Sequence, residues 1–281
     1  MPVATIDVPR GELVFSVRDH RPAGECRGVV LALHGWPQDS RSWDAVAERL
    51  VAAGYRVVAP DLRGASAGAA PRSRWAYRSS ELVADVEAVL EWIGEPVHLV
   101  GHDWGSGLAW QVAGVRPELV RTLTAVSVPH PGAFARSMLT TTQLPRWWYS
   151  VVFQLPVLPE LVLGNRKGLQ RGLEQAGLPV AAARRDAERL MDRRVRRGGV
   201  NWYRALPFTT PGLGFPRVGA PVLQVWGDRD PVILRRGCED SERYCSGGFE
   251  LVVLEGVAHF IPEEAPDRLA ELIVSHAGSV S

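Results

Sequence analysis

The sequence has few cysteines and almost no net charge, and each shortage argues against a class of protein. The 281 residues include only 3 cysteines, Cys26, Cys238 and Cys245, with no CxxC pair. This count argues against a disulfide framework and against a zinc site. The formal net charge is +1, so the overall charge gives no reason to expect binding to nucleic acid or to an anionic membrane.

Long apolar runs and targeting segments are also missing. No uninterrupted apolar run approaches the length of a membrane-spanning helix. The opening residues, MPVATIDVPRGEL, lack the basic segment and apolar core of a secretory signal. With 46% hydrophobic and 22% charged residues, the composition fits an ordinary globular protein, and the length permits one large domain with an insertion. We therefore expect a reduced, cytoplasmic protein.

The most informative stretch is the turn around Asp103, in the sequence VHLVGHDWGSG. The apolar run 97–100 predicts a buried strand and residues 108–115 predict a helix. Asp103 therefore stands on a sharp strand-to-helix turn with glycines on both sides, which is the pattern of a nucleophile elbow. The usual central residue is Ser, which needs a base, whereas a carboxylate is already ionised. It suits displacement at a saturated carbon, which leaves an alkyl ester on Asp103. A plain helix N-cap is the alternative interpretation.

Apolar strands alternate with amphipathic helices over most of the chain. The predicted strands are 4–8, 12–18, 29–33, 55–59, 97–100, 123–128, 221–226 and 249–254, and the predicted helices of the core are 42–53, 80–93, 108–115 and 266–276. Strands that are apolar throughout predict a mainly parallel sheet covered by helices on both faces. In such sheets the ligand chemistry lies at the carboxyl ends of the strands.

One long segment breaks this alternation. From about residue 132 to residue 216 the sequence has no strand-like run, but it has many prolines, several Trp and Tyr residues and helical stretches such as 180–195. We therefore predict an α/β core made of residues 1–131 and 217–281, with a helical cap at 132–216 that folds over the strand ends. Arginines are frequent from 184 to 197, but acidic residues interrupt them, which favours a solvated helix with ion pairs over a nucleic-acid site.

Hydrolysis of an ester on Asp103 requires a base and an acid that orients it. His259 follows the last predicted strand, where the chain order nucleophile, acid, histidine places the base. Its competitor is His130. Asp230 follows the preceding strand and is the candidate that orients the imidazole, with Asp228 as the alternative. The acid could instead follow the strand predicted at 123–128, but residues 127–132 contain no carboxylate. This favours an acid after the later strand, at Asp230.

An oxyanion hole needs backbone N–H groups close to the nucleophile. One is expected directly after it, at Trp104, and the other in the turn His34-Gly35-Trp36-Pro37 that follows an earlier strand. Pro37 has no N–H, so Trp36 is the candidate donor. Taken alone, this motif could be a plain turn.

The Asp nucleophile, the HGxP turn and the late Asp and His together resemble the epoxide hydrolase and haloalkane dehalogenase branch of the α/β-hydrolase family, over nearly the whole chain. The resemblance implies an α/β-hydrolase fold with an inserted helical cap. In the epoxide hydrolases of this branch, two cap tyrosines bind the epoxide oxygen. The contexts YSVVFQLP, which begins at Tyr149, and NWY, which ends at Tyr203, match, so the resemblance assigns these two tyrosines that role. A phenol is an adequate acid for a developing alkoxide.

The predicted activity is therefore conversion of an epoxide to a vicinal diol through an ester on Asp103, with no metal or organic cofactor. The expected partners are a small apolar epoxide and water, with no nucleic acid and no membrane, in a monomer or homodimer. The aromatic residues expected to contact the substrate are Trp36, Trp104, Trp148 and Phe153.

Two other functions stay open. Trp104 directly after the nucleophile would also suit halide binding in a haloalkane dehalogenase, although Trp36 stands where those enzymes usually have Asn. The second is a ligand-binding member of the fold without turnover, for which an incomplete triad would be the signature.

Overall fold

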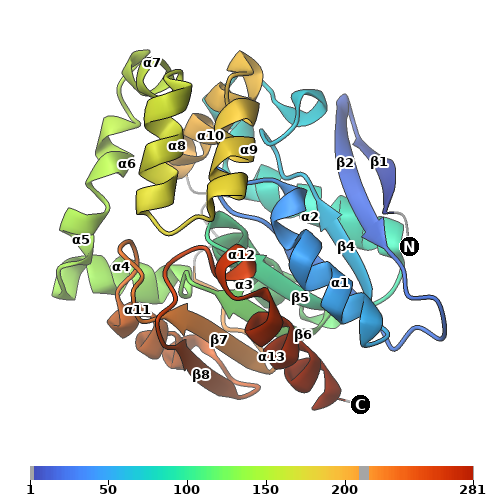
Figure 1. The fold of residues 1–281 in the computed structure, drawn as a ribbon. Coiled ribbons are helices and arrows are strands. Elements are labelled where there is room, and N and C mark those ends of the chain that lie inside the picture. The colour runs from blue at the N-terminus through green and yellow to red at the C-terminus, as the bar shows by residue number, and fades with distance from the viewer. Residues whose placement is uncertain (1–2, 209–214, 281) are drawn as a thin grey trace.

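A mixed sheet forms the centre of the molecule (Figure 1). The computed structural model describes residues 3–208 and 215–280. The sheet has eight strands in the order β1-β2-β4-β3-β5-β6-β7-β8. The strands are β1 (Ala4–Arg10), β2 (Leu13–His20), β3 (Val29–Leu33), β4 (Arg56–Pro60), β5 (Val97–His102), β6 (Val120–Val126), β7 (Val222–Gly227) and β8 (Phe249–Leu254). β1 and β2 pair antiparallel, and every pairing among β4, β3, β5, β6, β7 and β8 is parallel. The predicted, mainly parallel sheet is therefore confirmed.

Helices cover both faces of this sheet. Successive residues of β3 alternate between two cores: Leu31 and Leu33 pack in the cluster that includes α2 and α3, and Val30 and Ala32 pack in the cluster that includes α1 and α13. The helices of the core are α1 (Asp44–Ala52), α2 (Ser79–Ile93), α3 (Trp104–Val115), α11 (Arg235–Asp240), α12 (Ile261–Glu264) and α13 (Pro266–Gly278). A strand that is buried on both faces must be apolar throughout, which is why these strands could be predicted.

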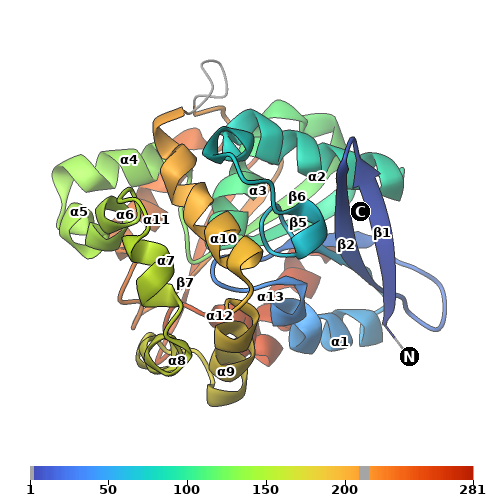
Figure 2. The same cartoon turned by 90° about the horizontal axis from the view of Figure 1, so that it is seen from above.

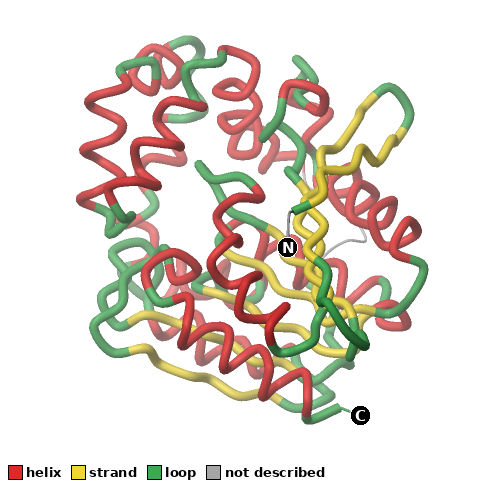
Figure 3. Tube along the Cα trace, turned by 45° about the vertical axis from the view of Figure 1, so that its right-hand side comes forward, coloured by secondary structure: helices red, strands yellow, loops and turns green. Residues whose placement is uncertain are grey.

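Between β6 and β7 the chain forms the helical cap. Its helices are α4 (Pro131–Thr140), α5 (Gln143–Arg146), α6 (Trp148–Val152), α7 (Leu158–Leu163), α8 (Arg166–Gln175), α9 (Val180–Arg189) and α10 (Arg193–Ala205). Figure 2 looks down on the cap and shows α10 crossing the middle of the molecule, and in Figure 3 the outer cap helices stand together at the upper left, above the strands.

The helix predicted at 180–195 is in fact two helices. α9 ends at Arg189 and α10 begins at Arg193, because the Asp192 side chain accepts a hydrogen bond from the backbone N of Arg194 at 2.7 Å and caps the second helix. Short 3-10 helices complete the fold: η1 (Ser40–Trp43), η2 (Ala67–Ala69), η3 (Arg74–Tyr77), η4 (Pro117–Leu119), η5 (Leu206–Phe208) and η6 (Ser241–Tyr244). None of the helices in the described part of the chain combines the length and hydrophobicity needed to cross a bilayer.

Candidate active site

Asp103 occupies a strained turn between β5 and α3. Its φ is 52° and its ψ is −121°, a conformation that non-glycine residues rarely adopt. The turn packs too tightly for larger neighbours: a Cβ on Gly101 would overlap the carbonyl of Gly105, and a Cβ on Gly105 would overlap the carbonyl of Leu33. The glycines on both sides are therefore required by the close packing of strand and helix, as expected for a nucleophile elbow.

The loop after β3 brings a backbone donor to the carboxylate. The backbone N of Trp36 donates a hydrogen bond to Oδ2 of Asp103 at 2.9 Å. This approach requires Gly35, since a Cβ at that position would overlap the Asp103 side chain. Trp104 is the first residue of α3, and the N–H groups of a first helical turn have no partner within the helix. Of the two N–H groups predicted for the oxyanion hole, that of Trp36 therefore binds the Asp103 carboxylate, and that of Trp104 stands at the start of α3 directly after Asp103.

His259 lies between two carboxylates. Its Nε2 is 3.4 Å from Oδ1 of Asp103, and its Nδ1 is 2.8 Å from Oδ2 of Asp230. Oδ1 of Asp230 accepts hydrogen bonds from the backbone N of Val232 at 2.7 Å and from that of Ile233 at 2.9 Å. The imidazole therefore donates through Nδ1 to a carboxylate that is itself held in place, and its Nε2 faces the Asp103 carboxylate.

The competing candidates have other contacts. The Asp228 side chain accepts a hydrogen bond from the backbone N of Gly256 at 2.7 Å, within the turn after β8. The buried His130 caps α4 and stacks on Tyr244, with ring centroids 4.0 Å apart. Neither side chain faces Asp103, so the structure brings together the three residues that the sequence favoured.

The role of His102 was missed at the level of the sequence. Its Nε2 donates to the carbonyl oxygen of His259 at 2.9 Å, and Oγ of Ser127 donates to the same oxygen at 2.7 Å. The backbone that carries the imidazole is thereby fixed to the ends of β5 and β6. In the sequence, the only sign of this role is the position of His102 directly before Asp103. The role itself depends on the loop that carries His259, which is 157 residues away along the chain.

The charges of the triad stabilise each other. Burial disfavours the charged imidazole, but the carboxylates of Asp230 and Asp103 outweigh it and raise the pKa of His259 to about 10. Burial also disfavours the Asp103 carboxylate, but the hydrogen bond and positive charge of His259 hold the pKa of Asp103 below its ordinary value. Both shifts favour a charged pair of the Asp103 carboxylate with a protonated His259.

An apolar cavity of about 400 Å³ opens beside Asp103. This volume suits a small organic ligand. Trp104 and Gln111 from α3 form part of its wall, together with Tyr149 and Tyr203 from the cap. The other lining residues are mostly apolar: Tyr77, Ser79, Leu82, Gly107, Leu108, Val128, Pro129, Pro131, Phe134, Ala135, Met138, Trp147, Trp202, Ala205, Leu206, Phe215, Val232 and Ile233.

The two cap tyrosines meet in this wall. The ring centroids of Tyr149 and Tyr203 are 5.9 Å apart, and Tyr203 lies edge-on to Trp104 at 5.0 Å. Gln154, from the segment after the first tyrosine, donates a hydrogen bond to the carbonyl of Tyr203 at 2.8 Å. Burial raises the pKa of both phenols well above their ordinary value, and the nearby Asp103 charge adds to this effect. Both phenols therefore remain hydrogen-bond donors at neutral pH.

Helix α10 lies close against the core, and this contact places Tyr203. Nε1 of Trp202 donates to the carbonyl of Arg63 at 2.7 Å. A Cβ on Gly199 would overlap the Trp36 ring, so a small residue is needed where the helix crosses the loop that binds Asp103. One helix thus carries a cavity tyrosine and contacts the turn that supplies a backbone donor.

Three of the four residues expected to contact substrate are not in the cavity wall among the described residues. Trp148 is 65% exposed, and Trp147 lines the cavity in its place, since adjacent residues at the start of a helix point about 100° apart. Phe153 and Trp36 pack edge-on against Tyr203, at 4.8 Å and 5.8 Å, and support its ring. Only Trp104 has the position expected.

The comparisons with known proteins agree with this architecture. Residues 28–266 match the family model for the alpha/beta hydrolase fold. The chain belongs to the α/β-hydrolase fold family. This α/β-hydrolase is 31% identical over 260 residues to the AB hydrolase superfamily protein YfhM of Bacillus subtilis, and the match covers 88% of this chain and 89% of that protein. It is 32% identical over 293 residues to epoxide hydrolase 2 of Siraitia grosvenorii, with 87% of this chain and 90% of that protein covered.

A solved structure is similar over the whole length of this α/β-hydrolase. The crystal structure of an epoxide hydrolase from Vigna radiata has a TM-score of 0.83 and 27% sequence identity, and the match covers 99% of this chain and 98% of that one. The predicted fold and the resemblance to epoxide hydrolases are thereby confirmed. Within residues 3–208 and 215–280, the structure has no group of three or more His, Cys, Asp or Glu side chains arranged to hold a metal ion.

Proposed function

We propose that this protein is an epoxide hydrolase that converts an apolar epoxide to a vicinal diol through an ester on Asp103. The observation that carries the proposal is the arrangement of the cavity. An ionised carboxylate paired with His259 lines it, and two phenols of the cap, Tyr149 and Tyr203, line it as well. A strained ether needs these two functions together, a nucleophile for its carbon and a hydrogen-bond donor for its oxygen.

In the first step, Oδ1 of Asp103 attacks one epoxide carbon, since Oδ2 is held by the Trp36 N–H. The new C–O bond replaces the bond to the epoxide oxygen, which leaves with the electron pair. That oxygen takes a proton from the tyrosine pair, because an alkoxide is more basic than even a phenolate with a raised pKa. The phenol regains a proton as the His259 imidazolium gives one up.

Ester formation prepares His259 for the second step. The Asp103 charge contributes to the raised pKa of the imidazole, and the ester is neutral, so the pKa of His259 falls and the ring becomes available as a base. It removes a proton from water, and the resulting hydroxide attacks the ester carbonyl carbon. The N–H groups of Trp36 and Trp104 stabilise the oxyanion that forms. Collapse breaks the acyl C–O bond, the departing alkoxide takes the remaining water proton, and the carboxylate returns.

The mechanism can be tested with isotopically labelled water. We expect enzyme in excess over an aryl epoxide in H₂¹⁸O to form an unlabelled diol in the first turnover, because the new diol oxygen comes from Asp103. The label should appear in the Asp103 carboxyl group, read by peptide mass spectrometry. A diol labelled in the first turnover would show direct attack by water. Absence of diol, together with halide release from an alkyl halide, would contradict the proposed function.

A further inference from the structure

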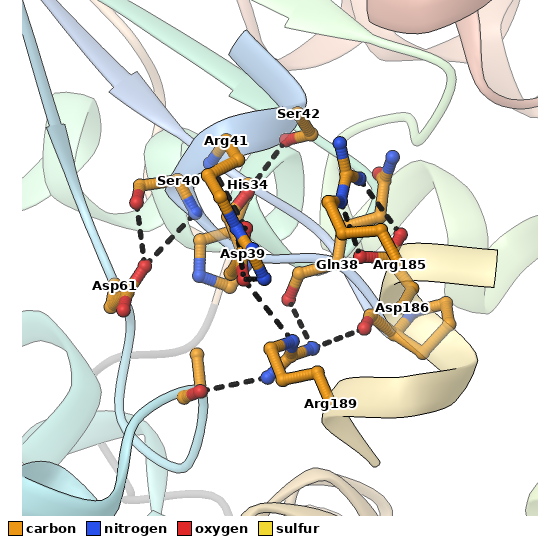
Figure 4. A network of polar contacts seen from close by, with 12 residues as sticks. His34, Gln38, Asp39, Ser40, Arg41, Ser42, Asp61, Arg185, Asp186 and Arg189 are labelled. Carbon is orange, nitrogen blue, oxygen red and sulfur yellow. Dashed lines mark hydrogen bonds and ion pairs between the residues drawn. The ribbon is translucent and has the colours of Figure 1, made fainter. Parts of the chain in front are cut away.

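Two arginines of cap helix α9 reach into the core on the active-site side. Arg185 and Arg189 are four residues apart and therefore share one face of the helix. Figure 4 shows the side chain of Arg189 pointing toward the loop that contains Asp39, whereas Arg185 pairs with Asp186 and Glu263. By contrast, the side chain of Arg184 is 69% exposed and pairs with Glu188 at 3.0 Å on the same helix. The arginine-rich run predicts a solvated helix here, and the structure shows that only one side of it is solvated.

Arg189 binds the backbone of two core loops. Its Nη2 donates to the carbonyl oxygens of Pro37 and Gln38, the latter at 2.9 Å, and its Nη1 donates to the carbonyl oxygen of Ala65 at 2.7 Å. Its Nε lies 3.2 Å from Oδ2 of Asp39, and only 13% of the Arg189 side chain is exposed. The guanidinium group therefore fixes the two peptide carbonyls directly after Trp36, the residue whose N–H binds the nucleophile.

The rest of that loop is fixed from within the core. The Asp61 side chain accepts hydrogen bonds from the backbone N of Ser40 at 3.0 Å and from its hydroxyl at 2.6 Å. Burial alone would raise the pKa of Asp39, but Arg41 and Arg189 hold it well below its ordinary value, so Asp39 is an anion that faces both cations. Figure 4 shows that the cap is joined to this loop through Arg189, which contacts Pro37, Gln38 and Asp39.

Helix α9 also contacts the segment that follows the base. Arg185 donates to Glu263 of α12 at 2.6 Å, four residues after His259. Phe260, the residue next to that histidine, is buried in a cluster with Leu178 and Ala183 of the cap. The same helix therefore contacts both the loop that carries the Trp36 N–H donor and the segment that follows the His259 imidazole.

The Trp36 N–H is needed most in the second step. In the resting site it binds a carboxylate oxygen, and during ester formation that charge disappears, so the hydrogen bond weakens as the transition state is reached. During ester hydrolysis the same oxygen becomes an oxyanion, so the hydrogen bond strengthens. A misplacement of about 1 Å in such a group can cost about a hundredfold in rate. Loosening the loop should therefore slow hydrolysis selectively.

We propose that Arg189 is a positioning residue that holds the Trp36 N–H against Asp103 and thereby makes ester hydrolysis depend on the docked cap. This inference rests on the proposed function, because it concerns the second step of that reaction. It assigns to the cap a task beyond lining the substrate cavity, namely completion of the oxyanion hole from above.

The test compares Arg189→Met with the matched control Arg184→Met on the same helix. Each protein is mixed rapidly with an aryl epoxide and quenched in acid, and intact mass measures the ester while chromatography measures the diol. We expect Arg189→Met to hydrolyse the ester about ten- to a hundredfold more slowly, with ester formation changed less than threefold, so that the ester accumulates. Arg184→Met should match the wild type, and Arg189→Lys should recover part of the hydrolysis rate.

The outcomes separate this inference from the proposed function. Unchanged ester hydrolysis in Arg189→Met, or equal slowing of both steps, would overturn the positioning role of Arg189. Diol formation by the wild type would still support the proposed function in that case. Absence of both ester and diol in the wild type would overturn the function and this inference together. If Arg189→Met does not fold, Arg189→Lys decides instead, since lysine keeps the charge but cannot donate to three carbonyls in the same fixed geometry.

Discussion

Asp103→Asn is expected to reduce epoxide turnover by about a thousandfold or more. The amide has no ionised oxygen, so the covalent step is lost. Asn also tolerates a positive φ, so the elbow at φ 52° should keep its shape. Diol formation, followed by chromatography, measures the effect. Intact mass is recorded in parallel, because hydrolysis of the amide by the active-site water would restore the wild-type carboxylate.

The result that would contradict a role for Asp103 as nucleophile is turnover within tenfold of the wild type. It must be measured on Asp103→Asn protein whose mass shows that the amide is intact. The thermal unfolding midpoint provides the structural control, since a protein that unfolds like the wild type but does not form diol has lost chemistry and not structure.

Joint replacement of Tyr149 and Tyr203 by Phe is the second change with a large expected effect. Both phenols line the cavity beside Asp103, and their ring centroids are 5.9 Å apart, so each can donate to the same epoxide oxygen. Loss of general acid catalysis typically costs about a hundred- to ten-thousandfold. We expect the double variant to lose turnover by that factor and each single variant to keep part of it, measured as kcat for diol formation.

Tyr55→Phe is the matched control, since Tyr55 is a buried tyrosine in the cluster on the other face of the sheet. It should leave kcat unchanged. A double Tyr149→Phe/Tyr203→Phe variant that turned over epoxide at the wild-type rate would contradict the role of these two phenols as the acid that protonates the epoxide oxygen. Halide release from an alkyl halide by that variant would indicate dehalogenase chemistry, which needs no phenol.

The parts of the site that could be predicted from the sequence are those whose geometry restricts which residues can stand next to them. A residue on a sharp turn needs small flanking residues, so Gly101 and Gly105 identified Asp103 as the centre of the elbow. Parallel strands end at one edge of the sheet, so residues that follow β5, β7 and β8 had to meet there. His259 and Asp230 follow two of those strands, and the structure places them 2.8 Å apart.

Side-chain directions in the cap could not be predicted in the same way. Trp147 and Trp148 are adjacent and chemically identical, and which one faces the cavity depends on how α6 is rotated about its axis. Arg184 and Arg189 likewise belong to one arginine-rich run, but one is exposed and the other binds the loop after Trp36. These assignments depend on packing between cap and core, which the local sequence pattern does not encode.

The intact mass of His259→Gln after incubation with an aryl epoxide tests the central claim most directly. Without a base the ester on Asp103 should form but not hydrolyse, although loss of the paired charge will slow its formation. We predict a mass gain of one whole epoxide, mapped to Asp103 by peptide mass spectrometry, under conditions in which the wild type forms diol and carries no adduct. An unmodified variant, or an adduct on another residue, would contradict the assignment of Asp103 as nucleophile and His259 as base.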